Sequence, residues 1–439
     1  MQKHQELLPH LFRQEYAKII AVLCRQFGIL HIEVAEDIAS EAFLKAADHW
    51  ALNGTPENPC AWLYTVAKNK AKDHLKHISI FENKVQYDLI SLMPDNEFGF
   101  EFNEQIIADS TLAMIFAVCN PLNSKEGQIC LALQILCGFS VEEIADALLS
   151  KKETIKKRLL RARAILRNGA FEIKPLKESD ISSRLNIVLK TLYLLFNEGY
   201  FSKSNNKLIR KDLCLEALRL NLALTEHELT NTPNVNALLS LMCYQSSRLD
   251  ARTDNGGEKI VFNEQDKKLW DDDLIHKGNY YLVCAFTGDS ASTYHLEAAI
   301  AYWHTTNDKD KWHHILDLYN QLIGINSSSS IALNRLFAVF NINGIDAAIA
   351  EAEFLDIKKN NYYHQLLAFL YTKKNPSKAL KHYEQAISIT RSKIERQMLR
   401  KKMLALQIEN NQQPIVLGLR TNIQYDDPVT GSSTLSSVS

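Results

Sequence analysis

The sequence predicts an all-α protein. Apolar residues recur three and four residues apart over most of the 439 residues, which is the spacing of one helix face. Segments that alternate apolar and polar residues between hairpin turns, as half-buried strands do, are nearly absent. The composition is 46% hydrophobic and 23% charged, with 15 glycines and 10 prolines, which is typical of a globular chain and excludes a fibrous or disordered one. At this length we expect roughly two to four domains.

Charge, hydropathy and cysteine spacing exclude several classes of protein. The 50 Lys and Arg residues are balanced by 51 Asp and Glu residues, which excludes a uniformly basic protein that coats nucleic acid. A local basic patch is still compatible with this balance. No run of 18 apolar residues predicts a membrane helix, and the polar residues 1–10 do not resemble a signal peptide. The eight cysteines never form a Cys-x-x-Cys pair, so we expect reduced core thiols without zinc or disulfides. We therefore predict a cytoplasmic protein with no cofactor or metal.

Three helices make up the first predicted block, residues 5–78. Apolar stripes place these helices over 5–27, 34–50 and about 61–77. Residues 79–109 then hold one basic residue against seven acidic ones, a net charge of −6, around a Pro-Asp-Asn break. We expect this segment to be an acidic linker between domains.

Two further helical blocks are predicted, over 110–170 and over 180–412. Within the longer block, pairs of alanines flank short polar turns, and the two pairs lie about 30 residues apart, near the tetratricopeptide period. The pairs are Ala338 with Ala348 and Ala368 with Ala379. Small residues let two helices pack closely, so we expect stacked helical hairpins that resemble tetratricopeptide repeats. The Ser-rich residues 418–439 have little to bury and are predicted to be disordered.

The strongest motif lies in residues 138–167. Ser140 followed by Glu143 predicts a capping box at the start of one helix. Ser150 followed by Glu153 predicts a second capping box only a few residues later, and two helices joined by so short a turn form a helix-turn-helix. The expected apolar face of the second helix consists of Ile155, Leu159, Ala162 and Leu166.

The rest of this second helix is basic. From Lys151 to Arg167, eight cations stand against one acid, a net charge of +7. In a nearly neutral protein, a helix with one apolar and one cationic face suits insertion into a DNA major groove. A solvated helix face is the alternative, but so many like charges would repel one another without a polyanion.

The motif resembles sigma region four, the C-terminal DNA-binding region of the extracytoplasmic-function sigma factors. The family pattern is matched at Gly138, Phe139, Ser140, Glu142, Glu143, Ile144, Ala145, Leu148, Thr154, Ile155, Lys156, Arg158, Leu159, Arg161, Ala162 and Arg163. The sequence departs from the pattern in the turn, at Leu149 and Lys151. The resemblance implies that the promoter −35 element is contacted by Lys152, Thr154, Lys156, Lys157, Arg158, Leu160 and Arg161. Among these, Arg161 is the best candidate to read a guanine edge and Lys156 to hold a phosphate.

An upstream segment, residues 35–46, resembles part of sigma region two. In the family this segment binds the clamp helices of the polymerase β′ subunit. Glu33, Asp37 and Glu41 repeat every four residues, and a basic partner would relieve the repulsion within this acidic stripe. An ordinary solvated acidic face is the alternative. The resemblance implies that core polymerase is bound by Glu33, Glu36, Asp37, Ser40 and Glu41.

The next segment, Ala-Trp-Leu-Tyr-Thr-Val-Ala-Lys-Asn from Ala61, resembles the helix of region two that lies on the −10 element. Four lysines against one aspartate give residues 61–76 a net charge of +3, which suits a helix on DNA. The loop before this helix occupies the place where the family captures a flipped base, which lowers the cost of strand opening. The implied −10 residues are Asn58, Thr65, Lys68, Asn69, Lys72 and Lys76. We expect Trp62 and Tyr64 to be core aromatics, with base stacking as the alternative.

The remaining chain resembles the extension of a subgroup of these sigma factors, in which a fused helical domain takes the place of a separate anti-sigma factor. The segments that carry this resemblance are Phe196–Gly199, Arg248–Arg252 and Glu264–Asp271. We expect Arg248, Asp250 and Arg252 to form ion pairs between helices, with a ligand pocket as the alternative. Several histidines lie near two acids and are expected to be surface or packing residues, with a metal site as the alternative. They are His295, His304, His313 and His314, near Glu297 and Asp317.

The sequence therefore predicts a sigma factor and not an enzyme. Its expected partners are core RNA polymerase, through the β′ clamp helices, promoter DNA, and an unknown protein or peptide for the C-terminal domain; no membrane is expected. The alternative is a helix-turn-helix repressor or adaptor with a helical-repeat sensor domain. The acidic helix and the −10 helix argue against this alternative, because a repressor needs neither.

Overall fold

The computed structural model describes residues 2–82, 102–148, 150–169, 171–200, 209–253, 260, 262–287, 291–358, 360–390 and 393–412. Regular secondary structure in these ranges is helical and includes no strand, so the predicted all-α fold is confirmed. No helix in these ranges is long and apolar enough to cross a membrane. The chain divides into unit 1, residues 1–355 with 392–394, and unit 2, residues 356–391 with 395–439.

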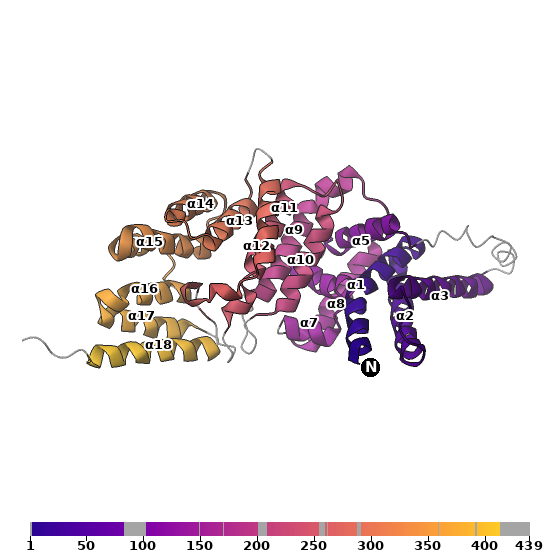
Figure 1. Ribbon diagram of the computed structural model, residues 1–439, viewed down its shortest axis with the longest axis horizontal. Helices are drawn as coiled ribbons and strands as arrows, with labels where there is room; N and C mark the ends of the chain where they lie inside the picture. Colours follow the sequence, from indigo (N-terminus) through magenta and orange to yellow (C-terminus); the bar gives the residue numbers. More distant parts are fainter. Residues whose placement is uncertain are drawn as a thin grey trace, which may run out of the picture. The chain divides into compact units, whose positions relative to one another are not determined.

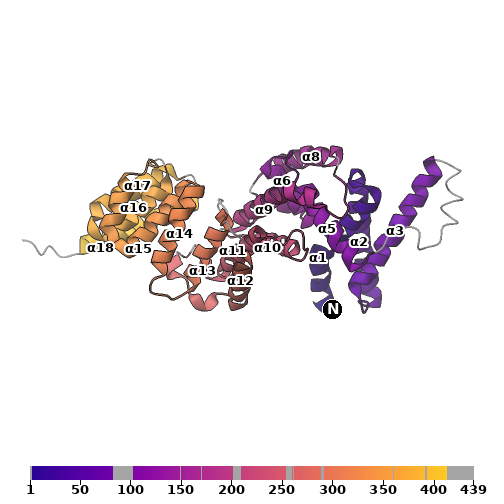
Figure 2. The ribbon, with the colours of Figure 1, turned by 90° about the horizontal axis from the view of Figure 1, so that it is seen from above.

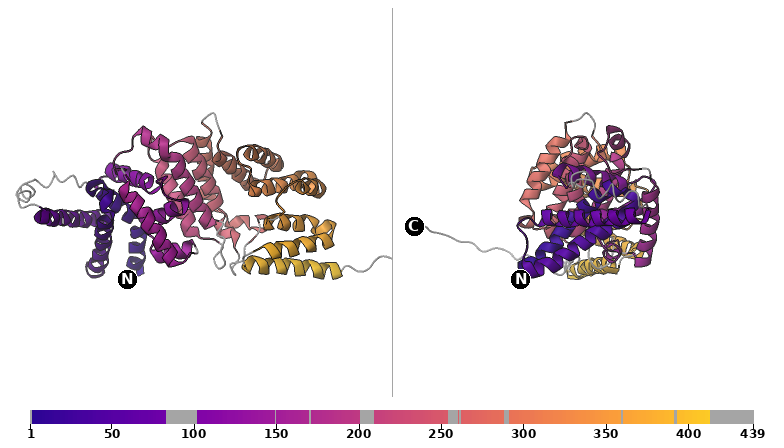
Figure 3. Two further views of the ribbon diagram at one scale, coloured as in Figure 1. Left: turned by 180° about the vertical axis from the view of Figure 1, so that it is seen from behind. Right: turned by 90° about the vertical axis from the view of Figure 1, so that its right-hand side faces the viewer.

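Three long helices open unit 1. They are α1 (Gln2–Phe27), α2 (Ile32–Asn53) and α3 (Pro59–Glu82), with a short 3-10 turn, η1 (Ile29–His31), between the first two. Gly28 and Gly54 end α1 and α2 with φ angles of 83° and 81°, which favour glycine. Phe12 of α1 stacks on Tyr16 and packs edge-on against Phe43 of α2, with ring centroids 4.5 and 5.0 Å away. Figure 2 shows α3 beside α2 at one end of the unit, and Figure 3 shows the same helices from behind.

Shorter elements follow in the second block. They are α5 (Glu104–Val118), α6 (Lys125–Leu131), the π-helical turn η2 (Ala132–Leu136), α7 (Val141–Ala147) and α8 (Lys152–Asn168). The side chains of Asn103, Ser124 and Ser140 cap α5, α6 and α7 by accepting backbone N–H groups. Both ends of the predicted acidic linker are helical, because α3 continues to Glu82 and α5 begins at Glu104. The middle of that linker, 83–101, lies outside the described residues.

The rest of unit 1 consists of seven helices and three 3-10 turns in the described ranges. The helices are α9 (Glu178–Tyr200), α10 (Lys211–Thr225), α11 (Pro233–Ser246), α12 (Asp272–Ala285), α13 (Thr293–Thr305), α14 (Lys311–Ile325) and α15 (Ser329–Glu353). The turns are η3 (Leu249–Arg252), η4 (Phe262–Glu264) and η5 (Lys267–Leu269). Helix α15 is broken at Gly344, where φ is 81°, so a helix–turn–helix pair lies where the sequence predicted a polar turn.

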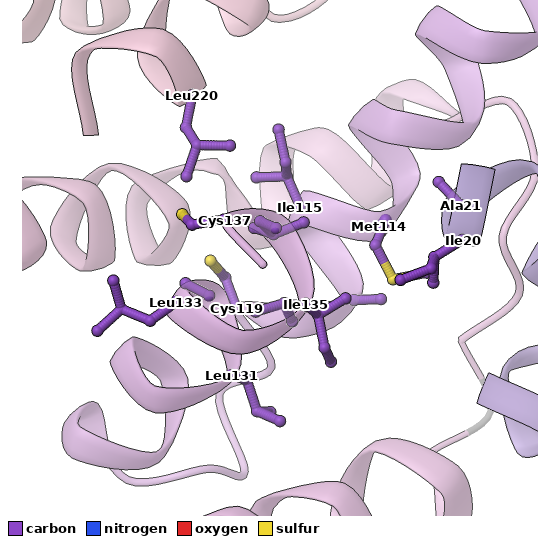
Figure 4. Close-up of a cluster of buried hydrophobic side chains, with 14 of the residues drawn as sticks. Ile20, Ala21, Met114, Ile115, Cys119, Leu131, Leu133, Ile135, Cys137 and Leu220 are labelled. Atoms are coloured by element: carbon purple, nitrogen blue, oxygen red, sulfur yellow. The ribbon is translucent and has the colours of Figure 1, made fainter. Parts of the chain in front are cut away.

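One contiguous apolar core joins α1–α3 to α5–α8 and to α9–α11. Figure 4 shows Met114 of α5 beside Ile20 and Ala21 of α1, and Cys137 beside Leu220 of α10. Each of these side chains is at most 1% exposed. Helix α5 therefore packs on α1 on one side and on α9 and α10 on the other. Burial of this kind, at about 25 cal/mol per Å² of apolar surface, makes helices α1–α10 one packed body.

The described residues of unit 2 form three helices. They are α16 (Asn361–Lys374), α17 (Pro376–Ile389) and α18 (Lys393–Gln412), which lie side by side in Figures 1 and 3. Ala368 of α16 and Ala379 of α17 are fully buried, and the turn between the two helices falls at the predicted place. Tyr371 stacks on His382 with a ring-centroid distance of 5.7 Å. The predicted disordered residues 418–439 lie outside the described residues.

Candidate functional site

Helices α7 and α8 are joined by a short turn and pack against each other. The hydroxyl of Ser140 accepts the N–H of Glu143 at 3.1 Å, and the Glu143 carboxylate accepts the N–H of Ser140 at 2.8 Å. The predicted capping box at the start of α7 is therefore confirmed. The matched pair fixes where α7 begins and hence the direction in which the chain enters the motif.

The second predicted capping box is wrong. Helix α8 begins at Lys152 with Lys151 as its N-cap, and no side chain caps it. The N–H of Ser150 donates to the carbonyl of Ala145 at 2.9 Å, so Ser150 belongs to the turn and not to the helix start. Leu149, where the sequence departs from the family pattern, lies outside the described residues.

The apolar and cationic faces of α8 lie as the sequence predicted. Ile155, Leu159, Ala162 and Leu166 are at most 4% exposed. The residues exposed to solvent include Lys152, Lys156, Lys157, Leu160 and Arg161, while Thr154 and Arg158 are half-buried. Leu160 is 66% exposed, which is unusual for a leucine and leaves an apolar contact point among the cations. Lys152 pairs with Glu142 at 3.0 Å, and both side chains are more than half exposed.

Two cations near the end of α8 face α2 instead of solvent. The guanidinium of Arg163 donates to the carboxylate of Glu36, and Arg167 pairs with Glu33 at 3.0 Å. Sequence reasoning assigned the two glutamates to polymerase binding and counted the two arginines among the DNA-facing cations. In this structure the four residues bind one another.

The remaining candidate polymerase-binding residues of α2 are accessible. Asp37, Ser40 and Glu41 are all exposed, and Glu41 pairs with Lys70 of α3. The opposite face of α2 is buried through Ile32, Ala35, Ile38, Ala39, Ala42, Phe43, Ala46 and Trp50. The acidic stripe thus lies on the solvent side of a well-anchored helix.

The candidate −10 residues lie along α3 or directly before it. Asn58 caps this helix, because its side-chain oxygen accepts the N–H of Ala61 at 3.0 Å. Thr65, Asn69 and Lys76 are exposed, and Lys68 and Lys72 are half-buried. The buried face consists of Leu63, Val66, Ala67 and Ala71, with Leu75 partly buried beside it.

Trp62 and Tyr64 are packing residues, as predicted. Trp62 contacts Trp50 edge-on with ring centroids 5.4 Å apart. Tyr64 stacks on Phe102 at 4.9 Å and donates its hydroxyl to Glu15. Burial and that carboxylate raise the pKa of Tyr64 far above its ordinary value, so the phenol stays neutral.

Comparisons with known proteins match two segments of this chain. Residues 11–79 match the sigma-70 region 2 family, and residues 184–286 match a family of unknown function, DUF6596. An uncharacterized protein of Rhizobium meliloti (strain 1021) is 30% identical over 339 residues, which cover 76% of this chain and 80% of that protein. This chain belongs to the family of that protein.

The sigma-70 region 2 match coincides with α1–α3 of this chain. The RNA polymerase sigma factor YlaC of Bacillus subtilis (strain 168) is 26% identical over 170 residues, 38% of this chain and 94% of that factor. No solved structure matches this chain. Region 2 and the distant similarity to a sigma factor indicate a role in transcription initiation, with RNA polymerase and promoter DNA as partners.

The DUF6596 segment is fastened to the helix-turn-helix block by polar contacts that sequence reasoning missed. Thr191 of α9 donates its hydroxyl to the buried Gln128 of α6 at 2.7 Å. Arg219 of α10 donates to the carbonyl of Leu136 at 2.9 Å. Arg210 pairs with Asp146 of α7 at 3.3 Å. No local sequence pattern signals these contacts, because each joins residues more than 60 positions apart.

The predicted ion pair between helices is present for Asp250, while Arg248 and Arg252 contact aromatic rings. The guanidinium of Arg248 lies over Phe262 at 4.8 Å and Trp270 at 5.6 Å, and Arg252 lies 3.6 Å from the centroid of Tyr200. Asp250 pairs with Lys211 at the start of α10.

Three of the histidines near Glu297 pack within unit 1. His295 is 2% exposed and bonds to Ser292 and to the carbonyl of Ala285. His304 lies between Phe262 and Trp312, and His314 stacks on Trp303 at 4.1 Å. Among the described residues, no three His, Cys, Asp or Glu side chains are grouped to hold a metal ion.

Glu297→Gln is expected to remove a pH dependence of stability. Burial raises the pKa of Glu297 from 4.5 to about 7, although the Tyr193 hydroxyl at 3.2 Å and the charge of Lys190 act against burial. The folded state therefore holds this proton more tightly than the unfolded state, so the free energy of unfolding falls as pH rises from 4.5 to 7. A tenfold difference in proton affinity corresponds to about 1.4 kcal/mol, so the loss is about 3 kcal/mol. Urea unfolding at pH 5 and pH 8 should show a stabilised variant at pH 8 only; an equal change at both values contradicts the assignment.

Proposed function

We propose that this chain is an extracytoplasmic-function sigma factor with a fused tetratricopeptide-like extension that modulates its activity in place of a separate anti-sigma factor. Region two binds core polymerase and opens the −10 element, and residues 110–170 act as region four at the −35 element. The observation that carries this proposal is the order of the parts in one chain. A sigma-70 region 2 match at 11–79 is followed by a helix-turn-helix whose second helix exposes cations.

In this proposal, the solvent-exposed side of α2 binds core polymerase. The exposed carboxylates of Asp37 and Glu41 lie one helical turn apart, with Ser40 between them. Like charges so close on one helix favour a basic partner, and complementary charge gives such a contact its specificity and speed. Glu36 and Glu33 complete the face once they are released from Arg163 and Arg167.

In this proposal, one face of α3 and one face of α8 bind promoter DNA. On α3, Thr65, Asn69 and Lys76 lie on the exposed side, where an amide and an ammonium group can reach bases and phosphates. On α8, Lys156 and Arg161 are exposed, and a bidentate arginine is the commonest reader of a guanine in the major groove. The proposal assigns the backbone contact to Lys156 and the base contact to Arg161.

In this proposal, the C-terminal extension of the chain is a stack of helical hairpins that controls the helix-turn-helix. Four alanines at the proposed helix crossings are fully buried: Ala338, Ala348, Ala368 and Ala379. This burial supports the tetratricopeptide-like pattern, in which small residues allow close packing. The contacts of α9 and α10 with α6, η2 and α7 give the extension a direct route to the DNA-binding motif.

Asp37→Lys is expected to abolish binding to core RNA polymerase. The change reverses the charge at the centre of the exposed acidic face, so a basic partner is repelled instead of attracted. Co-purification with bacterial core polymerase and promoter-dependent run-off transcription measure the effect. Asp48→Lys is the matched control, since Asp48 is exposed on the same helix about 16 Å further along and should leave binding intact.

Arg161→Ala is the converse variant and should leave core binding intact. Loss of one bidentate base contact costs about 1–3 kcal/mol, so transcription should lose specificity at one −35 position. If wild type binds promoter DNA but neither binds core polymerase nor initiates transcription, the chain is instead a helix-turn-helix repressor or adaptor. If Asp37→Lys still supports initiation, the assignment of α2 as the polymerase-binding face is wrong.

A further inference from the structure

A bidentate ion pair joins α8 to α2. The two terminal nitrogens of Arg163 donate to the two carboxylate oxygens of Glu36, at 2.9 and 2.5 Å. The Nε and Nη2 groups of Arg163 also donate to the side-chain oxygen of Gln134, at 3.0 and 2.8 Å. The side chain of Arg163 is 14% exposed and that of Glu36 is 16% exposed. A bidentate pair that is so well shielded from water has a fixed geometry and is screened much less than an exposed surface pair.

A second pair extends the contact along both helices. Arg167 lies 3.0 Å from the carboxylate of Glu33, and Arg163 lies 3.8 Å from the same carboxylate. Helix α8 also packs on η1, the turn that leads into α2. Two arginines and two glutamates therefore form one network that joins the end of α8 to the beginning of α2.

The network uses residues from both proposed binding faces. Glu33 and Glu36 belong to the acidic face of α2. Arg163 and Arg167 follow Lys156 by seven and eleven residues, about two and three helical turns, so they share its side of α8. The basic partner that the acidic face favours is thus already supplied by the same chain. Arg163 holds both oxygens of Glu36 and leaves that side chain 16% exposed, so a second basic partner has little access to it.

We infer that the end of α8 covers the polymerase-binding face of α2 in the free protein. The ion pairs between the two helices hold the free protein in this closed state. This inference rests on the proposed sigma function. Core polymerase must displace Arg163 and Arg167 before it binds Glu36 and Glu33, and this displacement adds the two arginines to the cations of α8 that are already exposed. The apparent affinity for polymerase is then the affinity of the open state multiplied by the fraction of molecules that are open. Binding of polymerase to α2 and release of Arg163 and Arg167 from α2 become one coupled event.

The test uses the full chain with Arg163→Gln and Arg167→Gln combined. The double variant should bind core polymerase about tenfold more tightly than wild type, because little of it remains closed. Arg163→Lys keeps the charge but loses the bidentate geometry, so its affinity should lie between those two. Arg161→Gln is the matched control: it removes the same charge from an exposed position of the same helix and should leave the affinity unchanged. Circular dichroism checks that each variant is folded.

A second measurement needs no polymerase. Hydrogen exchange of the backbone over residues 29–40 in the free protein should be several-fold faster in the double variant and unchanged in Arg161→Gln. Unchanged exchange in the double variant would overturn the closed state. Equal polymerase affinity of all variants that bind would overturn the blocking role while leaving the sigma function intact. Absence of polymerase binding in every variant and in wild type would overturn the sigma function, and the blocking role with it.

Discussion

A chain that ends at residue 175 is expected to lose its fold instead of acting as a minimal sigma factor. The core of the helix-turn-helix block is completed by side chains of α9 and α10, each at most 9% exposed: Leu185, Val188, Leu189, Leu192, Leu195, Leu213 and Leu220. Burial of one such side chain contributes about 1.5–3 kcal/mol. Together the seven side chains contribute about 10–20 kcal/mol, which is comparable to the stability of about 5–15 kcal/mol that a typical domain has.

Polar groups make the same truncation worse. Without α9, the side-chain oxygen of the buried Gln128 loses the hydroxyl of Thr191, and without α10 the carbonyl of Leu136 loses Arg219. Each of these hydrogen bonds contributes about 0.5–1.5 kcal/mol to stability. The truncated chain should therefore be aggregated on size-exclusion chromatography and show no cooperative melting by circular dichroism.

The matched control is a chain that ends at residue 355. It keeps the contacts of unit 1 up to Leu355 and should melt cooperatively at a temperature close to that of the full chain. A monomeric 1–175 fragment with a cooperative transition would show that the region-two and helix-turn-helix blocks have a core of their own. The role of the extension is then better studied with point variants such as those of Arg163, which leave the shared core complete.

The features of this molecule that the sequence predicted well are local ones. The apolar face of α8 and the capping box of α7 depend on residues within one or two helical turns, so spacing alone determines them. The break at Gly344 and the turn before α17 were predicted on the same grounds, from small and helix-breaking residues. The second capping box failed because Ser150 found a backbone partner, Ala145, in a turn that the helix-start rule does not consider.

Contacts between distant segments escaped prediction. Arg163 and Glu36 are 127 residues apart, and nothing in the periodicity of either helix selects one as the partner of the other. The one signal present was complementarity: an acidic stripe that favours a basic partner, and a helix with seven more positive than negative charges. Sequence reasoning sought those partners in polymerase and DNA. The structure supplies them first within the chain.

Gly199→Ala is expected to lower the free energy of unfolding of unit 1 by about 2–3 kcal/mol. A Cβ atom at this position would lie 2.7 Å from the carbonyl oxygen of Arg210, and 2.9 Å from both the sulfur of Cys214 and the Cβ of Leu213. The backbone carbonyl cannot move away without shifting the start of α10, so α9 and α10 must separate. Urea unfolding monitored by circular dichroism measures the loss.

Gly324→Ala is the control for this prediction, and it separates crowding from helix propensity. Gly324 lies in α14 with nothing within 4 Å of an added Cβ, so alanine should stabilise that helix by up to about 1 kcal/mol. Because α9 and α10 also hold Gln128 and Leu136, Gly199→Ala should further speed hydrogen exchange in α6 and η2, whereas Gly324→Ala should not. Equal stability of the two variants would mean that α9 and α10 can repack around the methyl group. Faster exchange in α6 and η2 would instead show that strain at one helix crossing of the DUF6596 segment reaches the predicted DNA-binding motif through the shared core.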